Sequence, residues 1–498
     1  MADALERLKS RLTDVAALDA VSSLLVWDQR TTMPPAGGSH RGDHLARLQR
    51  MSHELLIDPE TGKLLDELRS VEDSLDPDSI DASTIRVARR DYEKAVRVPA
   101  ELRAEMARAS ADSVPTWIEA KATSNFELFL PVLERNIELR RRYIDCYEPR
   151  DEPYDILLDD FEPEMRTAEV TRIFAEIRDE LVPLIASLRD SEVDDSFLTG
   201  DFPIDAQVAL DHEVIDLFGH RPGTWRLDPT EHPFASGAGI DDIRITTHYY
   251  PDALKSLFST MHEYGHGLYQ HQIPREFAQL PIGQAASLGI HESQSRLWEN
   301  LVGRSLPFWR FFYPRVQMTF PDALEGVELE RFLAAINKAE PSLIRIEADE
   351  VTYGMHVILR FELEQDIVNG RVELRDLPQR WAEKMHEYLG VDVPDDARGV
   401  LQDVHWGAGL IGYFSTYLLG TVMSVQIWEK ALEDVPDLED RIERGEFAEL
   451  REWLGTNIHA HARKHPPQEV LRRATGATID AKPYLAYLTK KYGAPVAA

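Results

Sequence analysis

Apolar residues recur every three or four positions along most of the chain, which is the spacing that one buried face of an α-helix requires. The first such stretch carries leucines and valines between residues 5 and 25 and stops at the proline- and glycine-rich segment 33–38. Long helical patterns then fill about 40–188. Later helices are predicted from about residue 252 and over about 285–304, 328–338, 343–368, 376–389, 408–431, 437–454 and 457–463. The chain is therefore predicted to be mainly α-helical.

One segment departs from this helical pattern. Glycine and proline are frequent over about 191–251, and helical periodicity there is weak. Within it, residues 242–250 alternate and are rich in β-branched and aromatic side chains, which favour strands. The sequence thus predicts one small β-sheet directly before the helix that begins at about residue 252.

The composition is that of a soluble globular protein, with 43% hydrophobic and 29% charged residues in 498 positions. No apolar run reaches roughly 18 residues, so we expect no membrane-spanning helix. The first residues lack the basic and then apolar layout of a signal peptide. Cys146 is the single cysteine, which excludes an intramolecular disulfide, and we therefore expect a cytoplasmic protein.

The chain is strongly acidic, with a formal net charge of −32. A polyanion of this size repels nucleic acids and anionic lipid surfaces, so neither is expected as a partner. We interpret the charge as a solvated surface that keeps the protein in solution.

Candidate chemistry begins in the helix predicted after residue 252, which carries an H-E-x-x-H motif at 262–266. Residues four apart lie on the same side of a helix, so the imidazoles of His262 and His266 face one point. This pattern suits a zinc-like cation, with Glu263 as the general base of a metallopeptidase. Gly265 and Gly267 are unusual inside a helix, and they indicate that close packing or an approaching substrate requires the missing side chains.

A catalytic zinc ion usually has three protein ligands and keeps one position for water. Candidates for the third ligand are His271, Glu276, His291, Glu292 and Glu299. His271 lies about 140° further round the same helix than His266 and is expected to point away. The helix that follows the turn near residue 283 can run antiparallel to the first. We prefer Glu292 on that helix and keep His291 as the alternative, because neighbouring helical residues differ by about 100° and only one of them should bind.

Peptide hydrolysis at such a site also needs hydrogen-bond donors for the tetrahedral oxyanion. His405, Tyr413 and Tyr417 are the candidates in this sequence. For each tyrosine, packing is the alternative role.

Six short motifs, in order along residues 27–417, resemble those of the carboxypeptidase Taq family of metallocarboxypeptidases. They are W-D-Q with M-P at 27–34, H-P-F at 232–234, D-x-R-x-T at 242–246, H-E-Y-G-H with H-E-S-Q-S-R at 262–296, I-R-x-x-A-D at 344–349 and G-x-x-Q-D-x-H-W at 399–406. The resemblance implies an elongated, mainly α-helical fold with a deep active-site cleft, related to neurolysin-like and angiotensin-converting-type peptidases. It also implies homodimers that release single C-terminal amino acids with broad specificity, using zinc or, alternatively, cobalt.

By motif match, the resemblance implies that His262, His266 and Glu292 bind the metal and that Glu263 is the base. His405, with Tyr413 or Tyr417, would stabilise the oxyanion.

Two arginines are candidates for substrate binding. Arg345 would bind the terminal carboxylate, for which a guanidinium offers a bidentate fork. The alternative for Arg345 is an ion pair with Asp349, one helical turn on. Arg244 would line the cleft, with an extended peptide beside the edge of its strand. Arg296, four residues after Glu292, would support the metal ligands from behind.

The chain is interpreted as one catalytic domain over 1–498, with a helical N-terminal part at about 1–190, an active-site part at about 191–420 and C-terminal helices at about 421–498. An oligopeptidase or dipeptidyl carboxypeptidase with the same ligands is the first alternative function. A non-catalytic helical protein with structural histidines is the second, although the general base Glu263 is present.

Overall fold

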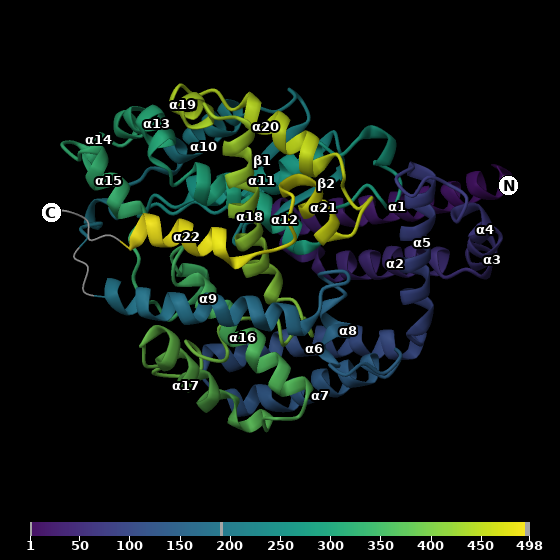
Figure 1. Ribbon diagram of the computed structural model, residues 1–498. Helices are drawn as coiled ribbons and strands as arrows, with labels where there is room; N and C mark the ends of the chain where they lie inside the picture. The colour runs from purple at the N-terminus through teal and green to yellow at the C-terminus, as the bar shows by residue number, and fades with distance from the viewer. Residues whose placement is uncertain (1, 190–192, 494–498) are drawn as a thin grey trace. The chain divides into compact units, whose positions relative to one another are not determined.

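The computed structural model describes residues 2–189 and 193–493. It is mainly helical and contains one three-stranded sheet, as the sequence predicts (Figure 1). The chain forms two compact units. Unit 1 consists of the described residues of 1–96, 194–336 and 424–478, and unit 2 of those of 97–193, 337–423 and 479–498. The sequence-based division into one catalytic domain with three parts stays a prediction.

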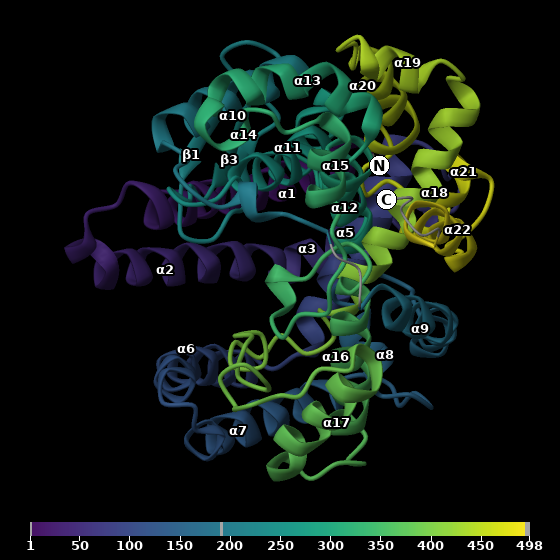
Figure 2. The ribbon, with the colours of Figure 1, turned by 90° about the vertical axis from the view of Figure 1, so that its left-hand side faces the viewer.

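Unit 1 contains the sheet and most of the helices around it. Its first two helices, α1 (Ala2–Thr31) and α2 (Gly38–Leu56), lie side by side (Figure 2). The other helices are α3 (Pro59–Glu67), α4 (Arg69–Glu72), α5 (Ile80–Arg97), α10 (Ile204–Phe218), α11 (Ser256–His271), α12 (Leu288–Arg296), α13 (Leu306–Thr319), α14 (Pro321–Leu324), α15 (Leu329–Ile336), α19 (Leu438–Glu443), α20 (Ala448–Leu454) and α21 (Pro467–Thr475). Two π-helical turns, η4 (Leu297–Val302) and η7 (Gly455–His459), follow α12 and α20 directly. Short 3₁₀ turns are η1 (Pro35–Gly37), η2 (Ser196–Leu198) and η3 (Arg275–Phe277).

The sheet consists of β1 (Trp225–Pro229), β2 (Ala235–Gly239) and β3 (Asp242–Thr247). β3 lies in the middle, parallel to β1 and antiparallel to β2. The sequence predicts β3 alone, because β2 consists only of alanine, serine and glycine, which have little β propensity. Ile243 and Ile245 are fully buried on the face that meets α11, whereas Arg244 points to the other face, where Trp27 of α1 packs.

Two glycines let α11 lie close to both of its neighbours. A Cβ on Gly265 would lie 2.7 Å from Cα of Ser295 in α12 and closer still to the backbone oxygen of Gln294. A Cβ on Gly267 would lie 2.8 Å from the Trp225 ring on β1 and 2.9 Å from Ile243 on β3. Of the two explanations that the sequence allows for these glycines, the structure shows close packing at each position.

Unit 2 is built around α16 (Tyr353–Val368), which is buried along nearly its whole length. Most of its buried residues are apolar, as expected for a helix in such a central position. Its neighbours α9 and α17 pack against it (Figure 1). The other helices of the unit are α6 (Ala100–Ala122), α7 (Phe126–Ile144), α8 (Tyr154–Leu158), α9 (Thr167–Leu188), α17 (Leu377–Leu389) and α22 (Ala481–Tyr492), with 3₁₀ turns η5 (Arg345–Glu347) and η6 (Leu374–Asp376). Helix α18 (Ser415–Asp434) belongs to unit 2 up to Met423 and to unit 1 from Ser424.

A buried carboxyl group on α16 joins three segments of unit 2. Glu364 has no exposed surface. It accepts hydrogen bonds from Tyr154 Oη at 2.6 Å, from Trp406 Nε1 at 2.9 Å and from the backbone N–H of Gly412 at 2.9 Å. These bonds satisfy a polar group that would otherwise be costly to bury. They also hold the loop before α18 against α8 and α16.

Several helices begin later than the hydrophobic pattern predicts. The helix predicted over 343–368 begins at Tyr353, because Asp349 accepts hydrogen bonds from the backbone N–H groups of Val351 and Thr352 and thereby favours a turn there. The helix predicted over 408–431 begins at residue 415. Before it, Gly409 and Gly412 have φ values of 72° and 98°, which are incompatible with a right-handed helix. Helices α21 and α22 are not predicted by the pattern at all.

Among the described residues, no helix combines the length and the apolar composition that a membrane span requires.

Replacing Gly265 with alanine is expected to lower the free energy of unfolding by about 1–3 kcal/mol, because the added methyl group meets backbone atoms that cannot rotate away. Gly42, inside α2, is the matched control, since a Cβ there has no neighbour within 4 Å. Gly42→Ala should stabilise the protein by about 0.4–1 kcal/mol. Thermal and urea unfolding measure both effects, and a Gly265→Ala variant as stable as the parent would show that this glycine does not set the spacing of α11 and α12.

Replacing Glu364 with glutamine is expected to weaken the pH dependence of stability. Burial raises the pKa of Glu364 from 4.5 to about 7, so within this interval the folded protein holds the proton more tightly than the unfolded chain does. The resulting stabilisation is complete below about pH 4.5 and is lost as the pH rises to about 7, a total of about 3 kcal/mol. Urea unfolding measures the free energy of unfolding at about pH 5 and at about pH 8. Between these values it should fall further for the parent than for Glu364→Gln. An equal fall for both proteins would contradict the raised pKa of Glu364.

Candidate active site

The H-E-x-x-H motif lies on α11 in the interior of unit 1. Apolar residues of this helix, among them Leu257, Met261 and Leu268, are fully or almost fully buried. The rings of His262 and His266 leave the same side of the helix, with centroids 5.0 Å apart and planes at 79°. This is the arrangement that four-residue spacing predicts.

The adjacent helix α12 brings a carboxylate to the two imidazoles. The helix begins after Ser287, whose hydroxyl accepts a hydrogen bond from the backbone N–H of Ile290 at 3.0 Å. Oε2 of Glu292, in the next turn, lies 3.6 Å from Nε2 of His262 and 3.4 Å from Nε2 of His266. We call His262, His266 and Glu292 the metal cluster, because the ligand atoms of the three side chains all lie within 4.8 Å of one another.

The metal cluster fits a zinc-like ion in both chemistry and size. Two imidazole nitrogens and one carboxylate oxygen form a common ligand set of catalytic zinc. Ligand atoms that surround such an ion tetrahedrally at about 2.0–2.1 Å lie about 3.3–3.4 Å apart, close to the two distances measured between Glu292 and the imidazoles. The donor atoms of the three residues and the two distances to Glu292 therefore fit one divalent ion.

Glu263 lies between the two histidines in sequence and is buried. Among the described residues, its Oε2 atom has no hydrogen-bond partner. Burial raises the pKa of this carboxyl group, an effect that the nearby imidazoles partly oppose. A buried carboxylate oxygen without a partner is rare in folded proteins and indicates a functional role.

A second group of charges lies behind the metal cluster. Nδ1 of His262 lies 2.8 Å from Oε2 of Glu299, which belongs to η4. Arg296 donates from Nε to Glu292 at 2.8 Å and from Nη1 to Glu299 at 3.2 Å. Arg296 thus contacts the ligand Glu292 from behind, as the sequence predicts. Glu299 lies beside Nδ1 of His262, on the side away from the metal cluster, and is not one of the converging ligand atoms. Such a carboxylate fixes the orientation and the tautomer of a metal-binding imidazole.

The electrostatics of this site favour a cation between the ligands. Burial lowers the pKa of His262, but the carboxylates of Glu292 and Glu299 outweigh that effect and raise it to about 9. Burial alone would raise the pKa of Glu292, but Arg296 and the imidazoles hold it well below its usual range. Glu292 is therefore ionised at neutral pH and available as a ligand.

Two other candidates for the third ligand lie elsewhere. Nδ1 of His271 lies 2.8 Å from the backbone oxygen of Ile240, so this side chain points away from the metal cluster as predicted. His291 stacks face to face on His266, with ring centroids 4.2 Å apart and an angle of 22° between the planes. Its nitrogens are not among the converging ligand atoms. The structure therefore brings Glu292, rather than its sequence neighbour, to the histidine pair.

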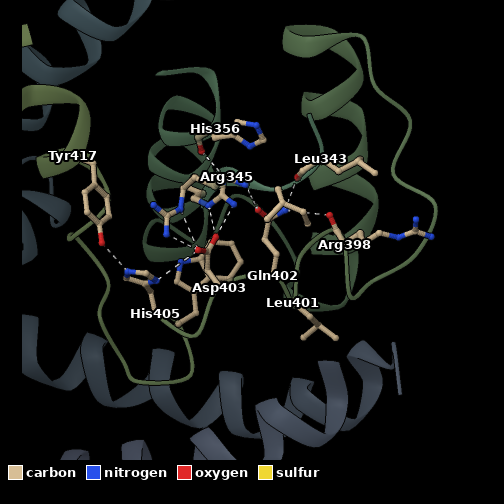
Figure 3. Close-up of polar contacts among 12 residues, drawn as sticks. Leu343, Arg345, His356, Arg398, Leu401, Gln402, Asp403, His405 and Tyr417 are labelled. Atoms are coloured by element: carbon tan, nitrogen blue, oxygen red, sulfur yellow. Dashed lines mark hydrogen bonds and ion pairs between the residues drawn. The ribbon is translucent and has the colours of Figure 1, made fainter. Parts of the chain in front are cut away.

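Arg345 belongs to a second cluster, in unit 2 (Figure 3). Its side chain is 7% exposed. Nε and Nη2 donate to Oδ1 of Asp403 at 3.1 and 2.8 Å, and Nη1 donates to Tyr353 Oη at 3.1 Å. Oδ2 of Asp403 accepts from Nε of the fully buried Arg360 at 2.8 Å. Asp349 accepts hydrogen bonds from backbone N–H groups near the start of α16. The ion pair between Arg345 and Asp349, which the sequence offers as the alternative, is therefore not formed, and Arg345 pairs with Asp403 instead.

His405 and Tyr417 complete this arginine cluster, which we define as Arg345, Arg360, Asp403, His405 and Tyr417. Nε2 of His405 lies 3.3 Å from Tyr417 Oη, and Figure 3 shows both side chains on the same side of Asp403. Burial lowers the pKa of His405 to about 4, so the ring is neutral at physiological pH. The guanidinium of Arg345 lies 5.0 Å from the centre of the Tyr417 ring.

Tyr413, the other predicted tyrosine, has aromatic neighbours on two sides. Its ring meets Phe161 edge to face at 5.2 Å and lies 5.4 Å from the ring of His405.

Arg244 contacts the sheet and α1. It donates from Nε and Nη2 to the two carboxylate oxygens of Asp242, at 2.8 and 3.1 Å, and its guanidinium lies 4.2 Å from the centre of the Trp27 ring. β3 is the middle strand and is paired on both edges, so an extended peptide cannot add beside it as the sequence suggests. These contacts join the D-x-R-x-T and W-D-Q motifs in one packing unit.

Comparison with known proteins extends the likeness from motifs to the whole chain. The Carboxypeptidase Taq (M32) metallopeptidase family matches over residues 7–492. Thermostable carboxypeptidase 1 of Thermus thermophilus is 42% identical over 493 residues, which cover 97% of this chain and 96% of that protein. Carboxypeptidase 1 of Bacillus subtilis is 36% identical, with 94% of each chain covered.

Solved structures give the same result for the fold. The crystal structure of the M32 carboxypeptidase from Deinococcus radiodurans superposes with a TM-score of 0.96 at 37% identity and covers 99% of each chain. The resemblance seen in the six motifs is therefore confirmed, and so are the mainly helical fold and the enzyme class. This chain belongs to the carboxypeptidase Taq (M32) family and is a metallocarboxypeptidase.

Proposed function

We propose that this enzyme releases single amino acids from the C-termini of peptides, with broad tolerance toward the side chain removed. Its family and the carboxypeptidases to which it is similar support the reaction class. The observation that carries the proposal is the convergence of His262, His266 and Glu292 next to a buried Glu263 whose Oε2 atom has no partner among the described residues.

The metal cluster is proposed to bind one divalent ion, with zinc as the first choice and cobalt as the alternative. Its ligand set and its spacing both fit zinc. A bound ion of this kind polarises a substrate carbonyl and makes water more acidic. Glu299 and Arg296 orient the ligands from behind through the contacts with His262 and Glu292.

Glu263 is proposed to be the general base. It takes a proton from the attacking water and later delivers a proton to the leaving amine nitrogen. Burial raises its pKa above that of an ordinary carboxyl group, which favours a role as general base and acid. Because Oε2 makes no hydrogen bond to the described residues, Glu263 does not have to break a protein contact before it acts.

Arg345 is proposed to bind the terminal carboxylate of the peptide. Asp403 contacts both Arg345 and Arg360, so one carboxylate is shared by two buried guanidinium groups. Positive charge therefore exceeds negative charge among these three residues, and an anionic substrate group is attracted there. Asp403 also fixes the plane of the Arg345 guanidinium through two hydrogen bonds.

Oxyanion stabilisation is proposed for His405 and Tyr417, with Tyr413 supporting them by packing. The neutral ring of His405 lies 3.3 Å from Tyr417 Oη and can hold that hydroxyl in place. Tyr417 then directs its O–H toward the substrate oxygen on which charge develops. Arg244 is kept as a candidate for lining the peptide site, although its contacts with Asp242 and Trp27 already give it a structural role.

We further propose a homodimer in the cytoplasm that acts on peptides and on neither nucleic acids nor membranes. The family resemblance supports the dimer. The single cysteine and the net charge of −32 support the compartment and the excluded partners.

Replacing Glu263 with glutamine is expected to lower kcat/KM by about 10²–10⁴-fold while the metal remains bound, because only the proton acceptor is lost. Mass spectrometry of a defined peptide measures the activity, and elemental analysis measures the metal content. Glu292→Gln is the control and should reduce the metal content itself, as should a chelator. A Glu263→Gln variant that is as active as the parent would refute the mechanism. Release of dipeptides or internal fragments would instead favour the alternative peptidase modes.

Replacing Arg345 with glutamine is expected to lower kcat/KM for peptides with a free C-terminus by about 10–100-fold, the effect of losing a charge-assisted hydrogen bond. Peptides with an amidated C-terminus should be affected much less, so the preference for the free acid should shrink. Arg398→Gln is the control, since Arg398 is 54% exposed and pairs with Asp395 at the surface. An unchanged ratio between free and amidated peptides would exclude Arg345 as the carboxylate receptor.

A further inference from the structure

The two histidines of the metal cluster are held in different ways. Nδ1 of His262 lies 2.8 Å from the carboxylate of Glu299. Nδ1 of His266 is buried and, among the described residues, has no hydrogen-bond partner. A ligand imidazole normally has its second nitrogen fixed by a carboxylate, a carbonyl or water. The contact that the structure shows on the His266 ring is of another kind.

That contact is a stack of aromatic rings. His291, at the start of α12, lies face to face with His266 at a centroid distance of 4.2 Å and an angle of 22°. Tyr269 of α11 follows at 5.8 Å from His291, and His459 of η7 stacks on Tyr269 at 4.8 Å and 26°. The four rings form a ring column from the metal ligand into the protein interior.

The far end of the ring column is held by close contacts with two glutamine amide groups. Nδ1 of His459 lies 2.6 Å from Oε1 of Gln272, the residue that caps α11. Nε2 lies 2.8 Å from Oε1 of Gln294 on α12. His459 is fully buried, so both amide groups hold it in an environment without competing water. The column is therefore supported by α11, α12 and η7 together, and its rings have little freedom to tilt.

We propose that His291 is a positioning residue that holds the imidazole of His266 in its metal-binding orientation through ring stacking. The inference rests on the proposed metal site. It assigns to the His291 ring the role that Glu299 has for His262, with a flat surface in place of a hydrogen bond. The nitrogens of His291 take no part in this role, because they are not among the converging ligand atoms.

Two variants separate the ring of His291 from its nitrogens. His291→Phe keeps a flat ring and removes both nitrogens. His291→Asn keeps a polar nitrogen at a similar position and removes the ring. The dissociation constant for Zn²⁺ is measured by competition with a chromophoric chelator, and thermal unfolding of the metal-free proteins reports whether each variant is folded.

We expect His291→Phe to bind Zn²⁺ with nearly the parent affinity and His291→Asn to bind at least about tenfold more weakly, the lower end of the effect of removing an outer support. Weak binding by His291→Phe together with parent-like binding by His291→Asn would overturn the proposal, because the nitrogen and not the ring would then matter. Parent-like binding by both folded variants would overturn it as well, and so would equal weakening of both.

Two controls separate this inference from the metal site itself. His266→Ala should abolish tight binding, and its failure to do so would refute the metal cluster independently of His291. His271→Ala removes a histidine from the same helix but outside the ring column, where its Nδ1 meets the backbone of Ile240. It should bind Zn²⁺ as the parent does, which shows that loss of a nearby imidazole is not enough to weaken binding.

Discussion

The approach of α12 to α11 is the constraint on which the rest of the site depends. Gly265 permits that approach, since any larger side chain would meet the backbone of Gln294 and Ser295. The approach places Glu292 between two imidazoles that belong to another helix. It also buries several carboxylates together, which is favourable only with compensating charge. Arg296 supplies part of that compensation from within α12, and a divalent ion between the ligands would supply the rest.

The two clusters carry charge of opposite sign. Around the metal ligands, buried carboxylates outnumber the guanidinium that contacts two of them. In unit 2, two buried guanidinium groups share one carboxylate, that of Asp403. A cation is therefore stabilised at the first cluster and an anion at the second. The proposed function assigns the polarising of a carbonyl to the first cluster and the recognition of a carboxylate to the second.

The sequence predicts best those features that depend on a few neighbouring residues. The imidazoles of His262 and His266 converge because four-residue spacing on one helix decides their directions. The choice between His291 and Glu292 depends on the rotation of α12 relative to α11, which a local pattern does not contain. The ion-pair partner of Arg345 could not be predicted for the same reason, because Asp403 lies 58 residues further along the chain. β2 was not predicted, because its alanine- and glycine-rich segment has little β propensity. It forms a strand through its pairing with β3.

Local backbone geometry gives independent support for the location of the site. π-helical turns are rare, and they occur frequently at functional sites. The described part of the chain contains two, η4 and η7. η4 carries Glu299 to Nδ1 of His262, and η7 carries His459 to the ring of Tyr269 and to the amide of Gln294. Both turns therefore bring a polar side chain to the residues around the ligand helices, as their frequent occurrence at functional sites leads one to expect.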